Sequence, residues 1–482
     1  MQQAGTQSAT QWAVQTFGAV RLGDQRRTER AVRIAAALAA NPAGSVPEQM
    51  GSAAATKATY RFLENARSSY EQLMAPHLSQ TQALMKQQPQ RWLLVQDMTE
   101  VEYTGNVEGL GPVGKGKHQR GYLLQSVLAI DPGTRQVLGL AAQEAFLRQP
   151  APAGENAHGR DQRKEKESQV WQRQVERIGA VAGGWTYVSV ADRGADIFAF
   201  LRAGQRLGQD FLVRAKHDRR VDVRVERGEE PLSAGEQRNG AKRSQKQEPI
   251  RHLHAEAESW EARGQQTITL DGNHKRRERE AQLLISWGQV RLWPPDGEGG
   301  KGEAPMVVTV VRTWEPNPPE GTTALSWLLL SSVPVTQEAE AWERVEWYRC
   351  RWIVEDYHQC LKTGTGSEER QLQSYGELRT LLGFLAPLAV RLLQLRATAR
   401  QTPERLAQEV LPKELVVVVA HLAKVAPERL TCRTCFRRIA QLGGFLGRKG
   451  DGEPGWKTLW KGWQHLQVLL EGFHLASQLN SE

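Results

Sequence analysis

The pattern of apolar residues changes near residue 91, and this change most limits what the chain can fold into. Before it, Ala-rich stretches interrupted by Asn and Pro predict helices. After it come short apolar runs, each closed by Asp, Gly or Pro: 92–95, 122–130 and 137–140. Two further runs alternate with helical stretches: 185–191 and 211–213. Strands that first follow one another and then alternate with helices predict a mixed α/β sheet.

A second change of pattern interrupts this sheet. The segment at about 216–323 is dense in charges and turns but contains short apolar runs, so we expect a β-rich insertion there. Residues 337–362 predict one long helix, and helical patterns continue to the end of the chain. The sequence thus predicts three regions: 1–75, 76–370 with the insertion, and 371–482.

Composition narrows the class of protein. With 482 residues, 40% of them apolar and 24% charged, the chain is long enough for about two or three domains and is not disordered. Only four cysteines, and no apolar run that approaches eighteen residues, favour a cytosolic protein. The formal net charge of +9 favours a polyanionic partner, and nucleic acid is the first candidate.

The most informative segment lies on the predicted helix at 337–362. At about 100° per residue, four polar side chains share one stripe: Tyr348, Arg351, Glu355 and Lys362. The opposite side is apolar and would pack against the core. An exposed helix stabilised by the i,i+4 pair of Arg351 and Glu355 explains the same stripe, so this segment alone leaves both interpretations open.

Two aspartates follow predicted strands. Asp97 comes after the run at 92–95, and Asp192 comes directly after the run at 185–191. Ligands collect at strand ends in open α/β sheets, and hard divalent cations prefer carboxylate oxygens. With Glu355, these residues form a candidate Mg²⁺ site. Asp196, in the same loop as Asp192, is expected only to cap the next helix.

These residues carry a family resemblance. Asp97, Asp192 and Glu355 occur in the order found in the DDE transposases of the IS-four insertion-sequence family, which the chain resembles. The spacing Tyr348-x2-Arg351-x3-Glu355-x6-Lys362 is similar to a motif of that family. The similarity runs nearly from end to end through further motifs: Gly23–Arg30, Thr59–Phe62, Ala191–Asp196, Val213–His217 and Leu459–Trp463.

The resemblance implies a fold and a reaction. The fold is α/β: a ribonuclease-H-like mixed sheet with a β-rich insertion, between a helical DNA-end-binding domain and a helical C-terminal domain for dimerisation and DNA contact. Three carboxylates would hold two Mg²⁺ ions, for which Mn²⁺ would substitute, roughly 3.5–4 Å apart. The enzyme would nick the transposon end, form and open a hairpin on the transposon DNA, and join the 3′-hydroxyl to target DNA. Trp327 matches the position whose indole stacks beside a flipped base; a core tryptophan at a strand start is the alternative.

The resemblance also implies the partners. Double-stranded DNA would be bound by a homodimer, in the bacterial cytoplasm and on the nucleoid when DNA is bound. Tyr348, Arg351 and Lys362 would hold phosphates at the catalytic site. Other basic residues match DNA-contact positions of the family: Arg26, Arg27, Arg30, Arg61, Arg214 and Lys216. Gln359 stands where the family motif has a lysine, so one phosphate contact is expected to be weaker or moved.

Two other functions remain open from the sequence. A non-catalytic relative would bind transposon ends and inhibit transposition, but an altered carboxylate triad would be expected and the triad here is intact. A plain metal-dependent nuclease of the same fold would cut without joining. The resemblance at both ends of the chain argues against the nuclease.

Overall fold

The N-terminal region is helical. The structure is a computed structural model that describes residues 8–87, 90–114, 116, 118–149, 154, 166–181, 183–222, 251–270, 279–296, 300–448 and 451–479. Five helices precede the sheet: α1 (Ala9–Phe17), α2 (Gln25–Ala40), α3 (Val46–Met50), α4 (Ala53–Leu63) and α5 (Tyr70–Met85). The side chain of Asp24 accepts a hydrogen bond from the N–H of Arg26 at 2.9 Å and so caps α2. The cap fixes where α2 begins, and with it the direction of the arginines in its first turns.

The described strands form one mixed sheet. Its first part contains β1 (Arg91–Tyr103), β2 (Gly111–Pro112), β3 (Arg120–Ile130), β4 (Val137–Phe146), β5 (Thr186–Ala191) and β6 (Asp210–Arg214). β1, β3 and β4 pair antiparallel, while β5 and β6 continue the sheet parallel to β1. The prediction of a mixed α/β sheet is confirmed. The pattern was visible because a strand with helices on both faces, such as β3, is buried almost throughout and is mostly apolar.

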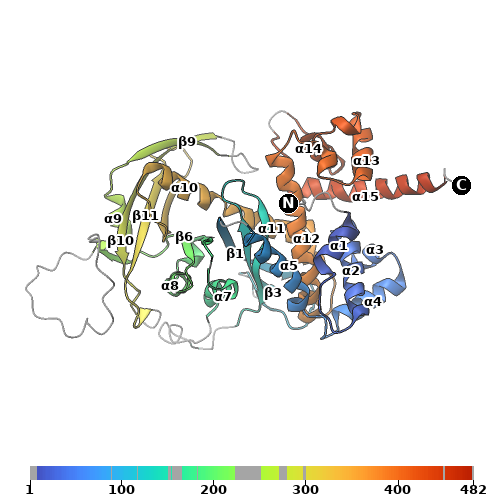
Figure 1. Cartoon of the computed structure of the whole chain (residues 1–482), viewed down its shortest axis with the longest axis horizontal. Helices are drawn as coiled ribbons and strands as arrows, with labels where there is room; N and C mark the ends of the chain where they lie inside the picture. The colour runs from blue at the N-terminus through green and yellow to red at the C-terminus, as the bar shows by residue number, and fades with distance from the viewer. Residues whose placement is uncertain are drawn as a thin grey trace, which may run out of the picture.

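Helices cover both faces of this sheet. On one face lie α7 (Gln169–Ile178) and α8 (Phe198–Arg206). On the other lie α5, α11 (Trp352–Gln359) and α12 (Tyr375–Gln401). Figure 1 shows α7 and α8 below the sheet and the N- and C-terminal helices gathered beyond α5 and α12. This is the ribonuclease-H-like arrangement that the resemblance implies.

The predicted β-rich insertion continues the same sheet. Its described elements, with the strand that follows, are β7 (Arg220–Asp222), β8 (Arg251–His252), α9 (Leu253–Glu258), β9 (Gly264–Leu270), β10 (Arg279–Leu292), β11 (Met306–Trp314) and β12 (Ser326–Ser331). β12 pairs with β6 on one side and with β11 on the other. The insertion is therefore joined to the catalytic part of the sheet through β12.

The prediction of one uninterrupted helix over 337–362 is wrong. The structure has α10 (Glu338–Arg349), α11 and then a π-helical turn at Cys360–Gly364. Between α10 and α11 the hydrogen bonds shorten to i→i+3, with Arg351 N–H bonded to the Tyr348 carbonyl at 3.0 Å. A tight turn before α11 and a wide turn after it change the direction of side chains on either side. The even 100° spacing assumed from the sequence therefore does not hold across this segment.

Helix α12 lies at the centre of the described core. It packs against α5 and β4 and also contacts α2 and α4. Its stretch Tyr375–Ala397 is long and apolar enough to cross a membrane, but 89% of the apolar window is buried inside the fold, as in a core helix. The remaining helices are α13 (Lys413–Ala423), α14 (Cys432–Leu442) and α15 (Trp456–Leu479), with 3₁₀ turns at 193–195, 367–369, 407–409 and 427–429.

Candidate active site and DNA-contact surfaces

Asp97 and Asp192 come from neighbouring parallel strands. β1 and β5 pair with Val95 beside Val190, so both aspartates lie two residues beyond this pair. Asp192 follows the end of β5, as predicted. The prediction that Asp97 also ends a strand is wrong, because β1 continues along β3 as far as Tyr103. The two carboxylates therefore lie where β1 loses its parallel neighbour.

Glu355 approaches this point from α11, together with Arg351. The guanidinium of Arg351 lies 3.3 Å from Asp97 Oδ2 and 2.7 Å from Glu355 Oε1. Burial and then the charge of Asp192 raise the pKa of Asp97 to about 6; the charge of Glu355 adds to this rise, whereas the Met98 amide and Arg351 oppose it. The structure thus brings the three predicted carboxylates into electrostatic contact.

The three carboxylates offer the donor atoms of a metal site but are not gathered around one point. The carboxylate oxygens of Asp97, Asp192 and Glu355 are the donors that a hard divalent cation prefers. Among the residues that the structure describes, however, no three carboxylate, imidazole or thiol groups are close enough together to hold a metal ion. The side chain of Arg351, which is 10% exposed, pairs with two of the three carboxylates. Asp192 is engaged as well, accepting a hydrogen bond from Gly194 N–H at 2.7 Å.

A second cluster borders the carboxylates. The ring of Trp327, half-buried near the start of β12, packs edge-on against Tyr348 with 5.4 Å between ring centroids. Arg214, at the end of β6, donates a hydrogen bond to Ser326 O at 2.7 Å and lies within hydrogen-bonding reach of the Tyr348 hydroxyl. Burial raises the pKa of Tyr348, so its hydroxyl stays protonated at neutral pH. Trp327 is thus partly buried and packs against the hydrophobic core.

Asp196 has a different role from the predicted one. Helix α8 has no side-chain cap, so the prediction that Asp196 caps it is wrong. Its fully buried carboxylate pairs with Arg219 and accepts hydrogen bonds from the N–H groups of Lys216 and His217 at 2.7 and 2.8 Å. Asp196 thereby joins the loop that carries Asp192 to the loop that carries Lys216. The Lys216 side chain itself is exposed.

Lys362 does not join the carboxylate cluster. It lies in the π-helical turn after α11 and pairs with Glu368 at 3.2 Å. Gln359, the departure from the family motif, is exposed on the last turn of α11. The stripe predicted from Tyr348 to Lys362 is thus divided between the active-site cluster and the surface next to it.

The N-terminal arginines predicted to contact DNA line one groove. Helices α2 and α4 face each other across an open cavity of about 540 Å³ whose basic lining residues are Arg26, Arg27, Arg30, Lys57 and Arg61. In the part of the chain that the structure describes, no carboxylate forms an ion pair with these four arginines, whereas Arg33 on the same helix lies 3.7 Å from Glu29. The groove keeps its positive charge available for an anion.

Two residues that sequence reasoning missed belong to these surfaces. Lys57 lies in the groove on α4, and no sequence motif of its own marks it. Trp352 is 60% exposed at the start of α11, with the Arg351 guanidinium 4.8 Å from its ring centroid. This exposed indole therefore lies next to the three predicted carboxylates, where it can contact a flat partner such as a base. Its adjacency to Arg351 in the sequence was the signal that could have identified it.

Comparison with known proteins gives a family for each part of the chain. Three family models match in sequence order: transposase DNA-binding at residues 9–68, transposase DDE domain at 88–386, and transposase Tn5 dimerisation domain at 387–482. A solved structure, the cryo-EM structure of piggyBac transposase synaptic complex with hairpin DNA, is similar at 9% sequence identity with a TM-score of 0.28. That match covers 80% of this chain and 54% of the other, so this chain spans about half the length of that protein.

The fold and the carboxylate site together define a DDE-type enzyme on a ribonuclease-H-like sheet. Because the DDE model covers more than half of its length, the chain belongs to the transposase DDE domain family. The order of a DNA-binding, a DDE and a dimerisation domain is that of a DNA transposase of the Tn5 type, and DDE domains use divalent metal ions.

Proposed function

We propose that this protein is a cut-and-paste transposase that uses Asp97, Asp192 and Glu355 to cut and rejoin DNA at transposon ends. The observation that carries the proposal is their convergence from β1, β5 and α11 beside Tyr348 and Arg214. Carboxylates gathered against their mutual repulsion need a cation as partner: Arg351 pairs with two of them here, and their oxygens are the donors that a divalent metal prefers. We infer Mg²⁺, with Mn²⁺ as a substitute.

The residues of the site divide the work of phosphodiester cleavage. Bound divalent metal would activate the attacking water or 3′-hydroxyl and stabilise the charge on the leaving oxygen. Asp97, Asp192 and Glu355 would hold that metal. Tyr348, as a neutral hydroxyl, and Arg214 would orient a phosphate of the bound strand through hydrogen bonds. Arg351 would exchange its carboxylate partners for a DNA phosphate.

The two tryptophans beside the site support excision through a hairpin. Bending a DNA end into a hairpin unstacks a terminal base at a cost of a few kcal/mol, which an aromatic side chain offsets by stacking. Trp327 offers a half-buried ring held by Tyr348, and Trp352 offers an exposed ring next to Arg351. We infer that Trp327 stacks on the displaced base, and that Trp352 lies near the position that this base leaves in the DNA stack.

The outer domains would supply end recognition and assembly. The arginine groove between α2 and α4 would bind the phosphates of a terminal repeat, with Lys216 and Lys362 contacting DNA closer to the active site. The described part of α15 exposes apolar side chains where a second copy could pack: Val468, Leu469 and Phe473. We propose a homodimer that pairs two DNA ends in the cytoplasm.

The decisive experiment follows end-labelled duplex DNA that carries the inverted repeats flanking the coding region. Wild-type protein with Mg²⁺ should give nicked, hairpin and joined products. Asp192→Ala should retain DNA binding and lose all three products, because one of the three carboxylates is gone. Asp296→Ala, at an exposed site away from the cluster, is the matched control and should behave as wild type. Nicking without any joining by the wild-type protein would favour the plain nuclease, and binding without nicking would favour the inhibitor.

A further inference from the structure

A row of polar side chains crosses the sheet beneath the catalytic helix. In the pairing of β1 with β3, Asp97 lies opposite Ser126. In the pairing of β3 with β4, Ser126 lies opposite Gln143. Directly opposite residues of antiparallel strands point to the same face. Asp97, Ser126 and Gln143 therefore form a line across three strands on the face covered by α11.

The segment around α11 makes one polar contact with each member of this row. Arg351 pairs with Asp97. His358 Nε2 lies 3.1 Å from the Ser126 hydroxyl. Gln143 Nε2 donates a hydrogen bond to the Tyr357 hydroxyl at 2.8 Å. These contacts begin one residue before the helix and end in its last turns, so they constrain both its depth above the sheet and its rotation.

The hydrogen bonds in the row satisfy one another. Gln143 Nε2 also donates to Ser126 Oγ at 3.0 Å, which leaves the Ser126 hydroxyl proton for His358. Burial, and then the charge of Lys362, lower the pKa of His358 to about 3, so the ring is neutral and its Nε2 can accept that proton. Gln143 Oε1 accepts a hydrogen bond from Tyr70, the first residue of α5, at 2.9 Å.

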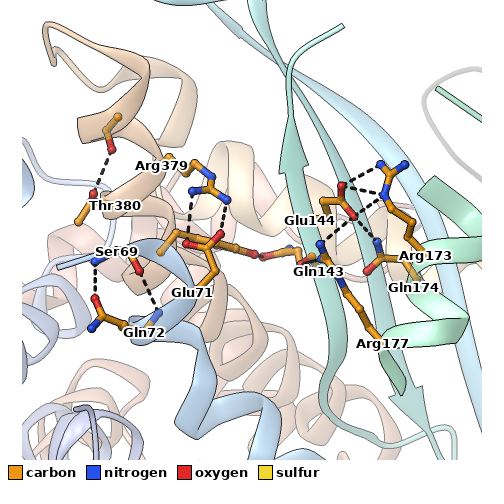
Figure 2. A network of polar contacts seen from close by, with 12 residues as sticks. Ser69, Glu71, Gln72, Gln143, Glu144, Arg173, Gln174, Arg177, Arg379 and Thr380 are labelled. Atoms are coloured by element: carbon orange, nitrogen blue, oxygen red, sulfur yellow. Dashed lines mark hydrogen bonds and ion pairs between the residues drawn. The ribbon is translucent and has the colours of Figure 1, made fainter. Parts of the chain in front are cut away.

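The side chains of Gln143 and Glu144 point to opposite faces of β4. Figure 2 shows Gln143 on the side of α5 and α12, and Glu144 on the other side with Arg173 and Gln174 of α7. Ser126 is completely buried and Gln143 is 3% exposed. A buried polar group that loses its hydrogen-bond partner lowers the stability of the fold. Small displacements of α11 would therefore break these hydrogen bonds at a cost in free energy.

We propose that Ser126, Gln143 and His358 are positioning residues for the DNA-cutting reaction, because they fix α11 and so place Arg351 and Glu355 against Asp97. The proposal rests on the function proposed above. Local helix geometry cannot supply this placement, since α11 follows a tightened turn and precedes a widened one. A displacement of about 1 Å at a catalytic group can cost about 100-fold in rate, so the row has a direct effect on the chemistry.

The test compares Ser126→Ala, His358→Phe and His358→Gln with wild type. The glutamine amide can place a hydrogen-bonding atom near the position of His358 Nε2, whereas phenylalanine cannot. Single-turnover nicking of end DNA is measured across a range of Mg²⁺ concentrations, together with DNA affinity and thermal unfolding. Ser126→Ala and His358→Phe should nick about 10- to 100-fold more slowly at saturating Mg²⁺ with unchanged DNA affinity. His358→Gln should recover most of the rate.

The matched control is Ser286→Ala, which removes another completely buried serine hydroxyl, from β10 of the same sheet. It should nick at the wild-type rate. Equal losses in His358→Phe and His358→Gln, or a Ser126→Ala variant as fast as Ser286→Ala, would overturn the proposal. If His358→Phe does not fold, the comparison of the two serine variants decides. Failure of the proposed function itself would appear differently, as absence of nicking by the wild-type protein.

Discussion

The guanidinium of Arg351 lies 3.3 Å from a carboxylate oxygen of Asp97, so the protein places a cation of its own at the carboxylate site. The same guanidinium pairs with Glu355 at 2.7 Å. A bound metal ion and Arg351 would therefore compete for the same negative charge, and DNA would favour the metal by offering Arg351 a phosphate instead. Binding of DNA and binding of metal should be coupled through this residue.

This coupling predicts a gain of metal affinity on removal of Arg351. Without DNA, Arg351→Ala should bind Mn²⁺ about 3- to 10-fold more tightly than wild type. A change of this size is what the loss of one weak ion pair produces. Titration followed by electron paramagnetic resonance of free Mn²⁺ measures it. Arg349→Ala is the control, since Arg349 pairs with Glu346 outside the site at 2.7 Å. Weaker Mn²⁺ binding by Arg351→Ala would contradict the competition.

The raised pKa of Asp97 predicts how stability depends on pH without metal. The folded protein binds this proton more tightly than the unfolded chain, so the free energy of unfolding falls as the pH rises from about 4 to about 6 and stays lower above pH 6. A pKa raised from 3.8 to about 6 corresponds to at most about 3 kcal/mol.

Asp97→Asn should therefore raise the thermal midpoint at pH 7 and leave it nearly unchanged at pH 4. Thermal unfolding in a chelating buffer at the two pH values measures this. A variant that is less stable than wild type at pH 7 would show that the bond to Arg351 outweighs burial and the repulsion by Asp192. Nicking should be lost in this variant at every pH, because the amide is a poor metal ligand.

The arginine groove predicts a salt-dependent affinity for end DNA. Each phosphate contact releases counterions from the DNA. Removing one contact should therefore make the negative slope of log affinity against log salt shallower by about one. Arg30→Ala and Arg61→Ala should each reduce the slope by about that amount and leave Mn²⁺ binding unchanged. Arg33→Ala, whose side chain is paired with Glu29 on the same helix as Arg30, is the control. Equal slopes in all variants would make the groove a surface feature only.

The position of Trp327 predicts a defect after the first nick. Trp327→Ala should nick at a normal rate, because nicking needs no displaced base, and should form or open hairpins about 10-fold more slowly. A gel of end-labelled DNA separates nicked, hairpin and released products. Trp314→Ala removes a tryptophan on the neighbouring strand, and it should leave the hairpin steps unchanged. Simultaneous loss of all products with a lower thermal midpoint would make Trp327 a structural residue.

The strands and the residues that follow them could be predicted from the sequence, because they depend on burial and on the local pattern of apolar residues. The runs that became β3 and β5 are apolar because helices cover them, and Asp192 follows β5 as expected. The change of helical geometry around Arg351 could not be predicted, because no Gly or Pro occurs in residues 338–362 to mark it. The roles of Asp196 and Ser126 were also hidden, since their partners are distant in the sequence: Arg219 and His358.

The matches to the DDE and dimerisation families meet between residues 386 and 387, within the continuous helix α12. No linker separates the two parts there, and residues on both sides, such as Phe384 and Leu388, are completely buried. A protein shortened at this boundary would expose a broken core helix, so the catalytic part should not be obtainable as a stable fragment. A substitution in α12 would then affect subunit pairing and catalysis at once. The catalytic and dimerisation parts are therefore expected to be inherited together.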